Sequence, residues 1–229
     1  NNSFSGWMDE IRIYPYARTA NEIKKDRAAG SSGRAAQRAQ EGVSATFGGG
    51  GDQTLSDGLV GYWKMDESSW NGTTGEVLDA SGNANHGIAV ADATTTAGKF
   101  GNGGVFDGTG DYVDAGNVSE FQDLSALTIS AWVNLSAQHD GTIIAKDYAY
   151  WLKATDDGGT FHYNFTLAEI DGSLSSNASP STSVWEHVVA TYDGAMMKIF
   201  INGIQDQNTQ AKTGDTGPGN WGLAIGRDV

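Results

Sequence analysis

The alternation of apolar and polar residues predicts β-strands over most of the chain after Leu59. Leu127, Ile129, Ala131 and Val133 alternate with more polar neighbours, and side chains at every second position share one face of a strand. Residues 185–192 and 197–201 form a predicted hairpin, because the intervening Asp-Gly dipeptide favours a tight turn. Further strands are predicted at 59–63, 104–106, 112–114, 142–145, 148–153, 160–167 and 223–225.

The first thirty residues predict one strand and one short helix. Residues 7–14 alternate so that Trp7, Asp9, Ile11 and Ile13 share a face, and Pro15 ends the strand. Of these, Trp7, Ile11 and Ile13 form a predicted apolar interface with the rest of a sandwich. Thr19-Ala20-Asn21-Glu22 fits a capping box, which predicts a helix to about Ala29, closed by Gly30.

Composition indicates a single all-β unit. The chain has 229 residues, of which 38% are hydrophobic, enough for one large sandwich with a buried core. Its 32 glycines and three prolines suit many short strands joined by tight turns. We expect a terminal strand and helix at 1–30, a linker at 31–56 rich in glycine at both ends, and the body of the sandwich at 57–229.

Charge and cysteine content exclude several classes of partner. The net charge is −14, although residues 1–38 carry seven basic and four acidic side chains. Such an acidic body repels nucleic acids and anionic lipid surfaces, so we expect no nucleic-acid partner. No apolar run is long enough for membrane insertion, and the absence of cysteine excludes disulfides and thiolate metal sites.

Several runs, in consistent order, resemble one known family. They are DGLVGYWKMDE, LDASGNANHG, GGVFDGTGDYVDAG, LTISAWVN, WEHVVATYDG, KIFINGI and GWMDEIRIYPYARTANEI. They are similar to the laminin-G-like domains of bacterial surface proteins, within the concanavalin-A-like lectin/glucanase superfamily. This resemblance implies a two-sheet antiparallel jelly-roll sandwich at a microbial cell surface or in the extracellular space.

The order of these runs departs from the family in one respect. GWMDEIRIY normally ends such a domain, after a strand like GLAIGRDV, but here it begins the chain. A register-shifted repeat, a fragment spanning two domains and an engineered circular permutant all fit this order. A sandwich lacking a central strand leaves backbone groups unpaired. The first strand therefore fills that position either in its own domain or, by head-to-tail donation, in a neighbour.

The sequence predicts no enzyme. The resemblance implies that an active glucanase of this superfamily would carry several carboxylates on one face of a strand. The nearest run here supplies only Glu169 and Asp171 before a Gly-Ser turn. The four histidines show no HExxH spacing.

Calcium is the expected cofactor, in a structural role. The resemblance implies a cation held by an Asp of the terminal strand, here Asp9, and by groups near the first strand of the body. The matching positions are Asp66, Asp79, Ser81 and Asn83. Oxygen ligands of this kind suit calcium, although Asp, Asn and Ser also cap turns without any metal.

Aromatic residues indicate a possible glycan surface. Trp7, Trp63, Trp132 and Trp185 lie in alternating strand patterns and are predicted to be core residues. Trp70 lies in a polar loop, and Tyr148, Tyr150 and Trp151 could line a concave face. The leading expectation is a structural or adhesive subunit that self-associates into a homopolymer or tandem array. The alternative is a carbohydrate-binding module of a larger secreted protein.

Overall fold

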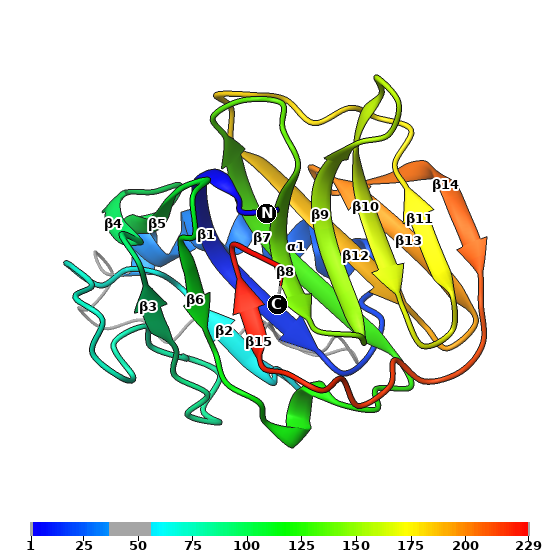
Figure 1. The fold of residues 1–229 in the computed structure, drawn as a ribbon, viewed down its shortest axis with the longest axis horizontal. Helices are drawn as coiled ribbons and strands as arrows, with labels where there is room; N and C mark the ends of the chain where they lie inside the picture. The colour runs from blue at the N-terminus through cyan, green and yellow to red at the C-terminus, as the bar shows by residue number, and fades with distance from the viewer. Residues whose placement is uncertain (1, 37–55, 229) are drawn as a thin grey trace.

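A computed structural model describes residues 2–36 and 56–228 as a sandwich of two antiparallel sheets (Figure 1). The eight-stranded sheet has the order β14-β13-β12-β7-β1-β5-β4, with β2 paired to β1. Its strands are β1 (Ser5–Tyr14), β2 (Gly61–Trp63), β4 (Thr94–Ala97), β5 (Asn102–Asp107), β7 (Leu127–Leu135), β12 (Glu186–Tyr192), β13 (Met196–Ile201) and β14 (Ile204–Ala211). The predicted all-β sandwich is confirmed.

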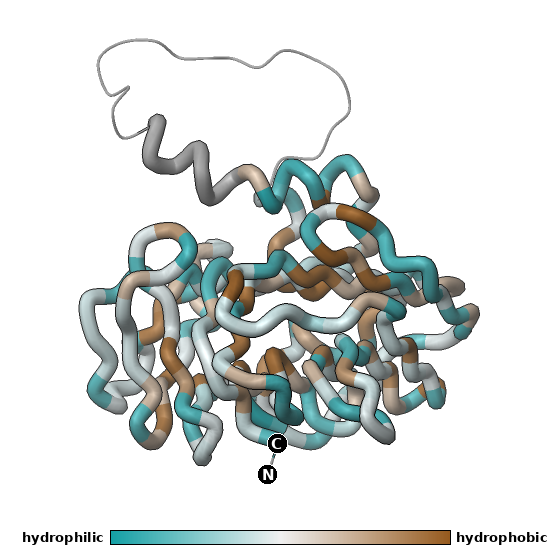
Figure 2. The backbone as a smooth tube through the Cα atoms, turned by 90° about the horizontal axis from the view of Figure 1, so that it is seen from above, coloured by the Kyte–Doolittle hydropathy of each residue, from teal (hydrophilic) through white to brown (hydrophobic). Residues whose placement is uncertain are grey.

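The seven-stranded sheet faces it, in the order β11-β10-β9-β8-β15-β6-β3. Its strands are β3 (Ile88–Val90), β6 (Tyr112–Asp114), β8 (Gly141–Lys146), β9 (Tyr150–Asp156), β10 (Phe161–Leu167), β11 (Gly172–Ser175) and β15 (Leu223–Ile225). A 3-10 helix, Ser119–Phe121, follows β6. Figure 2 shows hydrophobic segments of both sheets between the two layers.

Strand β1 lies in the middle of its own chain's sheet. It pairs with β7 along one side, and with β5 and then β2 along the other. Its backbone groups are therefore satisfied on both edges, as a central strand requires. Of the two placements that the sequence leaves open, this structure shows insertion in the same chain.

A bulge in β1 makes one sequence prediction wrong. The pairing with β7 shifts register between Asp9 and Arg12, and Glu10 has a φ of 55°. This extra residue reverses the alternation. Met8, Ile11 and Ile13 therefore enter the core, whereas Trp7 is only partly buried outside it.

Helix α1 (Ala20–Ala36) begins as predicted and ends later. The Thr19 amide donates to Glu22 Oε2 at 2.7 Å, and the Glu22 amide donates to Thr19 Oγ1 at 3.4 Å, which confirms the capping box. The helix does not end at Gly30, because a glycine inside a helix costs only about 1 kcal/mol. It therefore occupies the start of the predicted linker, whose residues 37–55 lie outside the described part of the chain.

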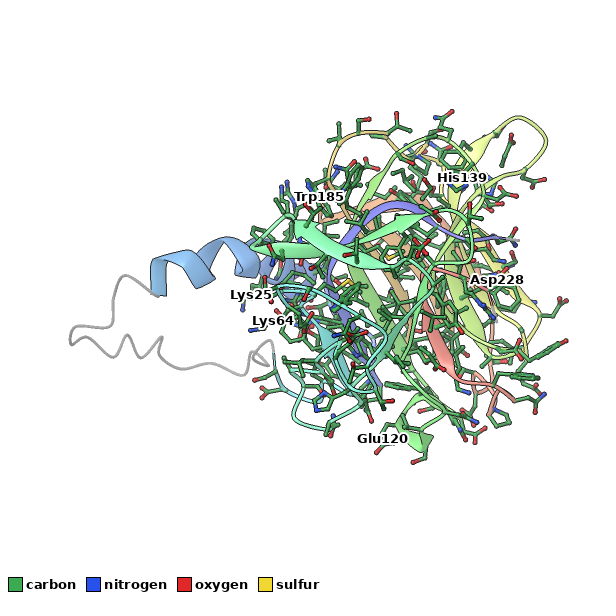
Figure 3. All side chains as sticks on the ribbon, turned by 60° about the vertical axis from the view of Figure 1, so that its left-hand side comes forward. Lys25, Lys64, Glu120, His139, Trp185 and Asp228 are labelled. Atoms are coloured by element: carbon green, nitrogen blue, oxygen red, sulfur yellow. The ribbon has the colours of Figure 1, made fainter. Side chains whose placement is uncertain are left out.

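The first turns of α1 pack on the outer face of the eight-stranded sheet. Ile23 forms a small buried cluster with Val189 and Phe200. Beside it, Arg18 Nε lies 2.7 Å from Asp26 Oδ2, and both side chains are fully buried. The helix extends away from the sandwich on the side opposite Asp228 (Figure 3).

Four strands were not predicted from the sequence: β3, β4, β11 and β14. β14 is largely exposed and polar at the edge of its sheet, with the sequence IQDQNTQA. Because neither face of β14 is buried, its sequence does not alternate between apolar and polar residues. Neither helical segment within 2–36 and 56–228 has the length and apolar character needed to cross a membrane.

Candidate functional site

The turn between β8 and β9 presents two aromatic residues on the outer face of the seven-stranded sheet. Tyr148 adopts a left-handed backbone conformation, with φ of 55°, and is 66% exposed. Trp151 follows on β9, where it is paired with Ala145 of β8 and Thr166 of β10. Ala145 and Trp151 both line a pocket at this turn.

A pocket of about 210 Å³ lies at this turn. It is lined by Ala145, Asp147, Tyr148, Trp151, Lys153 and Asp228. Trp151 and Lys153 are two residues apart on β9, so their side chains share the outer face. The sequence patterns identified Tyr148 and Trp151 but gave no signal for the polar residues around them.

Asp147 brings a hydrogen-bond acceptor into the pocket. Its side chain is 8% exposed, and its Oδ2 atom has no hydrogen-bond partner among the described residues. Burial raises its pKa above the usual value, although the Tyr148 amide and the charge of Lys146 oppose this. Lys146 Nζ itself donates to Asn117 Oδ1 and to the Trp221 carbonyl. The Asp147 Oδ2 atom is shielded from solvent, so a bound molecule would have to displace neighbouring side chains before it could donate a hydrogen bond to it.

Lys153 and Asp228, which also line the pocket, form an ion pair. Lys153 Nζ lies 3.0 Å from Asp228 Oδ2 and 4.8 Å from the centroid of the Trp151 ring. Asp228 also accepts hydrogen bonds from Asn2 Nδ2 at 2.7 Å and Thr142 Oγ1 at 2.8 Å. Burial favours the neutral form of Asp228, but these donors prevail and lower its pKa.

Two predicted ligand-binding residues lie elsewhere. Tyr150 is fully buried, because successive side chains of β9 point to opposite faces and this one enters the core. Trp70 is also a core residue, 7% exposed, with its ring near Gly104 of β5. Its indole Nε1 donates to Glu67 Oε2 at 3.1 Å, which satisfies its polar atom. The prediction of a binding role is therefore wrong for both residues.

The four tryptophans predicted to be core residues differ in their burial. Trp63 is fully buried in the main core. Trp132 is 4% exposed but lies outside that cluster, against Phe100 and His187. Trp7 and Trp185 are only partly buried.

The five predicted metal ligands form two groups. Asp79 accepts from the amides of Tyr62, Ser81 and Asn85, and Asn83 Nδ2 donates to the carbonyl of Leu59. Asp79, Ser81 and Asn83 therefore cap their own loop. Within 2–36 and 56–228, no three His, Cys, Asp or Glu side chains form a metal-binding cluster.

Asp9 and Asp66 flank a different loop. Asp9 is fully buried, its Oδ2 accepts from the Phe100 amide at 2.8 Å, and its Oδ1 has no hydrogen-bond partner among the described residues. Asp66 Oδ1 accepts from the Asn102 amide at 3.0 Å. Burial, with repulsion from Glu10 and Asp66, raises the pKa of Asp9 to about 8. A buried carboxylate with a free oxygen near a second carboxylate fits a cation-binding position.

The predicted acidic pair at Glu169 and Asp171 lies on the surface. Both residues are exposed in the turn that joins β10 to β11. They are separate from the residues that line the Trp151 pocket.

The sandwich of two antiparallel sheets is that of a concanavalin A-like jelly roll. The family model described as the concanavalin A-like lectin/glucanases superfamily, a laminin-G-like model, matches residues 107–229. This range is more than half of the chain, so the chain belongs to that superfamily. No curated protein shows a match.

Solved structures with a similar fold include the following two. One is domain 4 of AbnA, an extracellular GH43 arabinanase from Geobacillus stearothermophilus, in complex with arabinotriose. It is 19% identical, with a TM-score of 0.48, over 66% of this chain and 77% of that one. The other is described as a putative carbohydrate binding protein from Bacteroides ovatus, 13% identical, with a TM-score of 0.37, over 98% of this chain and 66% of that one.

Proposed function

We propose that this chain is a non-catalytic saccharide-binding domain of a larger extracellular protein. The observation that carries the proposal is the pocket that Trp151 and Tyr148 line together with the polar residues Asp147 and Lys153. Sugar rings stack their C–H faces on aromatic rings, and their hydroxyls donate to carboxylates. The pocket offers both kinds of contact.

Charge favours a neutral sugar over an anionic one. The chain carries a net charge of −14, and the cationic Lys153 is already paired with Asp228. Acidic polysaccharides would meet repulsion from Asp147. We therefore infer a neutral oligosaccharide as the ligand class.

The same contacts argue for binding without hydrolysis. A glycosidase needs one carboxylic acid to donate a proton and a second carboxylate to attack or activate water. Asp228 is held as an anion by Asn2, Thr142 and Lys153. Both carboxylate oxygens of Asp228 therefore already accept hydrogen bonds. Asp147 thus has no second carboxylate in this pocket that is available to act with it in hydrolysis.

Isothermal titration against neutral and uronic oligosaccharides tests the proposal. We expect binding to neutral sugars, lost in Trp151→Ala and weakened at least tenfold in Asp147→Asn, since an acceptor becomes in part a donor. Trp221→Ala is the matched control, because Trp221 is 65% exposed but does not line the pocket. Binding that survives Trp151→Ala would contradict this site.

A second candidate function is assembly by exchange of β1 between copies. The segment 2–28 pairs through β1 with β7, β5 and β2, and packs through Ile23 against Val189 and Phe200. A second copy could supply the same contacts, as in domain swapping. This supports a filament or tandem array whose domains complete one another.

A cysteine pair can distinguish exchange from self-insertion, because the chain has no native cysteine. Ser5 Oγ of β1 lies 2.5 Å from Ser136 Oγ, just beyond the end of β7. In a Ser5→Cys, Ser136→Cys variant, exchange predicts a ladder of covalent multimers on a non-reducing gel. Closed monomers alone would reject exchange, and Ser5→Cys alone is the control for random cross-linking.

We also propose that calcium binds beside Asp9. The free Oδ1 of Asp9, the neighbouring Asp66 and the side-chain amide of Asn102 supply oxygen atoms of the type calcium prefers. A cation there would neutralise a carboxylate that is costly to bury. Asp79, Ser81 and Asn83 are left out of this proposal because they bond within their own loop.

A further inference from the structure

A chain of polar contacts connects the start of the N-terminal segment to the Trp151 pocket. Asn2 Nδ2 donates a hydrogen bond to Asp228 Oδ2 at 2.7 Å, and the same oxygen accepts a hydrogen bond from Lys153 Nζ at 3.0 Å. Lys153 Nζ lies 4.8 Å from the centroid of the Trp151 ring. Asn2 does not line the pocket, so any influence it has on binding must pass through Asp228.

The backbone around Asn2 is fixed by the same neighbours. The Thr142 amide donates to the Asn2 carbonyl at 2.9 Å, and the Phe4 amide donates to the Gly226 carbonyl at 2.7 Å. Residues 2–4 therefore lie against β8 and the residues that follow β15. When β1 is seated in the sandwich, these contacts place the Asn2 side chain next to Asp228.

Asp228 is held from three sides. Thr142 Oγ1 donates to its Oδ1 at 2.8 Å, while Asn2 and Lys153 approach its Oδ2. Without Asn2, one of the three donors is lost and the carboxylate gains freedom to rotate. A lysine that is not held by a fixed carboxylate samples many rotamers, and this freedom is lost again when a ligand binds.

Lys153 also has hydrogen-bonding capacity to spare. Its ammonium carries three protons, and the two oxygens of Asp228 are its hydrogen-bond acceptors in this structure. One N–H therefore remains for a sugar hydroxyl next to the Trp151 ring.

We propose that Asn2 is a positioning residue for the pocket: through Asp228 it holds Lys153 beside Trp151, so that saccharide affinity depends on the N-terminal segment being seated. This inference rests on the proposed saccharide-binding function. It makes binding sensitive to strand insertion, whichever copy of the chain supplies β1.

The test measures affinity and positioning separately. Cellotriose, xylotriose, mannotriose and arabinotriose serve as probes in titrations of the full chain and its variants. For a probe that binds, Asn2→Ala should weaken affinity about two- to tenfold, the range for immobilising one flexible side chain. The thermal unfolding midpoint should change little, because one hydrogen bond at a partly exposed site is lost.

A double-mutant cycle identifies the route. If Asn2 acts through Lys153, then Asn2→Ala combined with Lys153→Met should bind no more weakly than Lys153→Met alone. Ser5→Ala is the matched control, because it alters the same end of β1 without touching Asp228, and it should leave affinity unchanged. Additive losses, or an unchanged affinity in Asn2→Ala, would overturn the proposal.

A ligand-free readout separates this inference from the proposed function. In the wild-type chain, nuclear Overhauser contacts should connect the Lys153 side-chain end to the Trp151 ring, and they should weaken in Asn2→Ala but not in Ser5→Ala. If none of the sugars binds, the proposed function fails. Contacts that persist at full strength in Asn2→Ala would overturn the positioning role in either case.

Discussion

His187 Nε2 lies 2.9 Å from Ser130 Oγ across the β7–β12 pair, at a site where the histidine is fully buried. Its Nδ1 atom has no partner among the described residues. Trp132 covers the ring, with a centroid distance of 5.2 Å. Burial therefore favours the neutral form of the imidazole.

Acidification should destabilise the fold through His187. Burial, followed by the charges of Arg12 and Arg27, lowers its pKa from 6.5 to about 3. The unfolded chain binds a proton below pH 6.5 while the folded chain does not, so this contribution is lost as pH falls from 6.5 towards 3. At pH 5 the loss should be about 2 kcal/mol.

Urea unfolding at pH 7 and pH 5 measures this effect. In His187→Gln, the difference between the two pH values should shrink by about that amount, since a glutamine does not titrate. Other titrating groups are common to both proteins and cancel in the comparison. An unchanged pH dependence in the variant would show that His187 is not responsible.

The Arg18–Asp26 pair should be sensitive to the loss of either partner. Both side chains are fully buried, and Arg18 Cζ also lies 4.3 Å from the centroid of the Tyr14 ring. Arg18→Met leaves Asp26 buried without its counter-charge, which should cost about 3–5 kcal/mol of unfolding free energy. Combining it with Asp26→Leu should recover most of that loss.

The exposed pair Lys198–Asp193 provides the control. Its charged atoms are 3.7 Å apart and its side chains are 33% and 41% exposed. Lys198→Met should cost about 1 kcal/mol or less, because water screens the pair. Denaturant titration of the three variants would contradict the argument if Arg18→Met and Lys198→Met cost the same unfolding free energy.

The bulge in β1 predicts an order of sensitivity along that strand. Met8→Ala should cost about 2–5 kcal/mol, because Met8 is fully buried in the core. Trp7→Leu should cost less, because the Trp7 side chain is partly exposed outside the core. Thermal unfolding with equal or greater loss in Trp7→Leu would favour the regular alternation that the sequence predicts.

Calcium should raise the thermal unfolding midpoint relative to EDTA, since a ligand that binds only the folded state stabilises it. In Asp9→Asn this shift should disappear. Asp79→Asn, which alters a carboxylate already bonded within its loop, should retain it. A shift that depends on Asp79 and not on Asp9 would move the cation to the other loop.

Local patterns predicted most strands and the start of the helix because those features depend on neighbours in sequence. Leu127 to Val133 alternates and becomes β7, and Thr19 with Glu22 forms the expected cap. Where a strand has no buried face, as in β14, the pattern carried no signal. The bulge at Glu10 was also invisible, because it depends on pairing with β7.

The candidate site was predictable only in part. Tyr148 and Trp151 stand out as aromatic residues near a turn, but the same run includes Tyr150, which the pleat turns into the core. Periodicity separates the two faces of a strand without saying which face is outside.

The sequence by itself determined the all-β class and most strand positions, since these follow from alternation and turn residues along the chain, and the resemblance of several runs to known domains indicated the family. Only the tertiary structure brought Asn2 to Asp228, which are 226 positions apart, and placed Lys153 beside Trp151. Contacts of this kind depend on which strands become neighbours in the sheets. Strand order is set by the packing of the whole core and not by any local pattern.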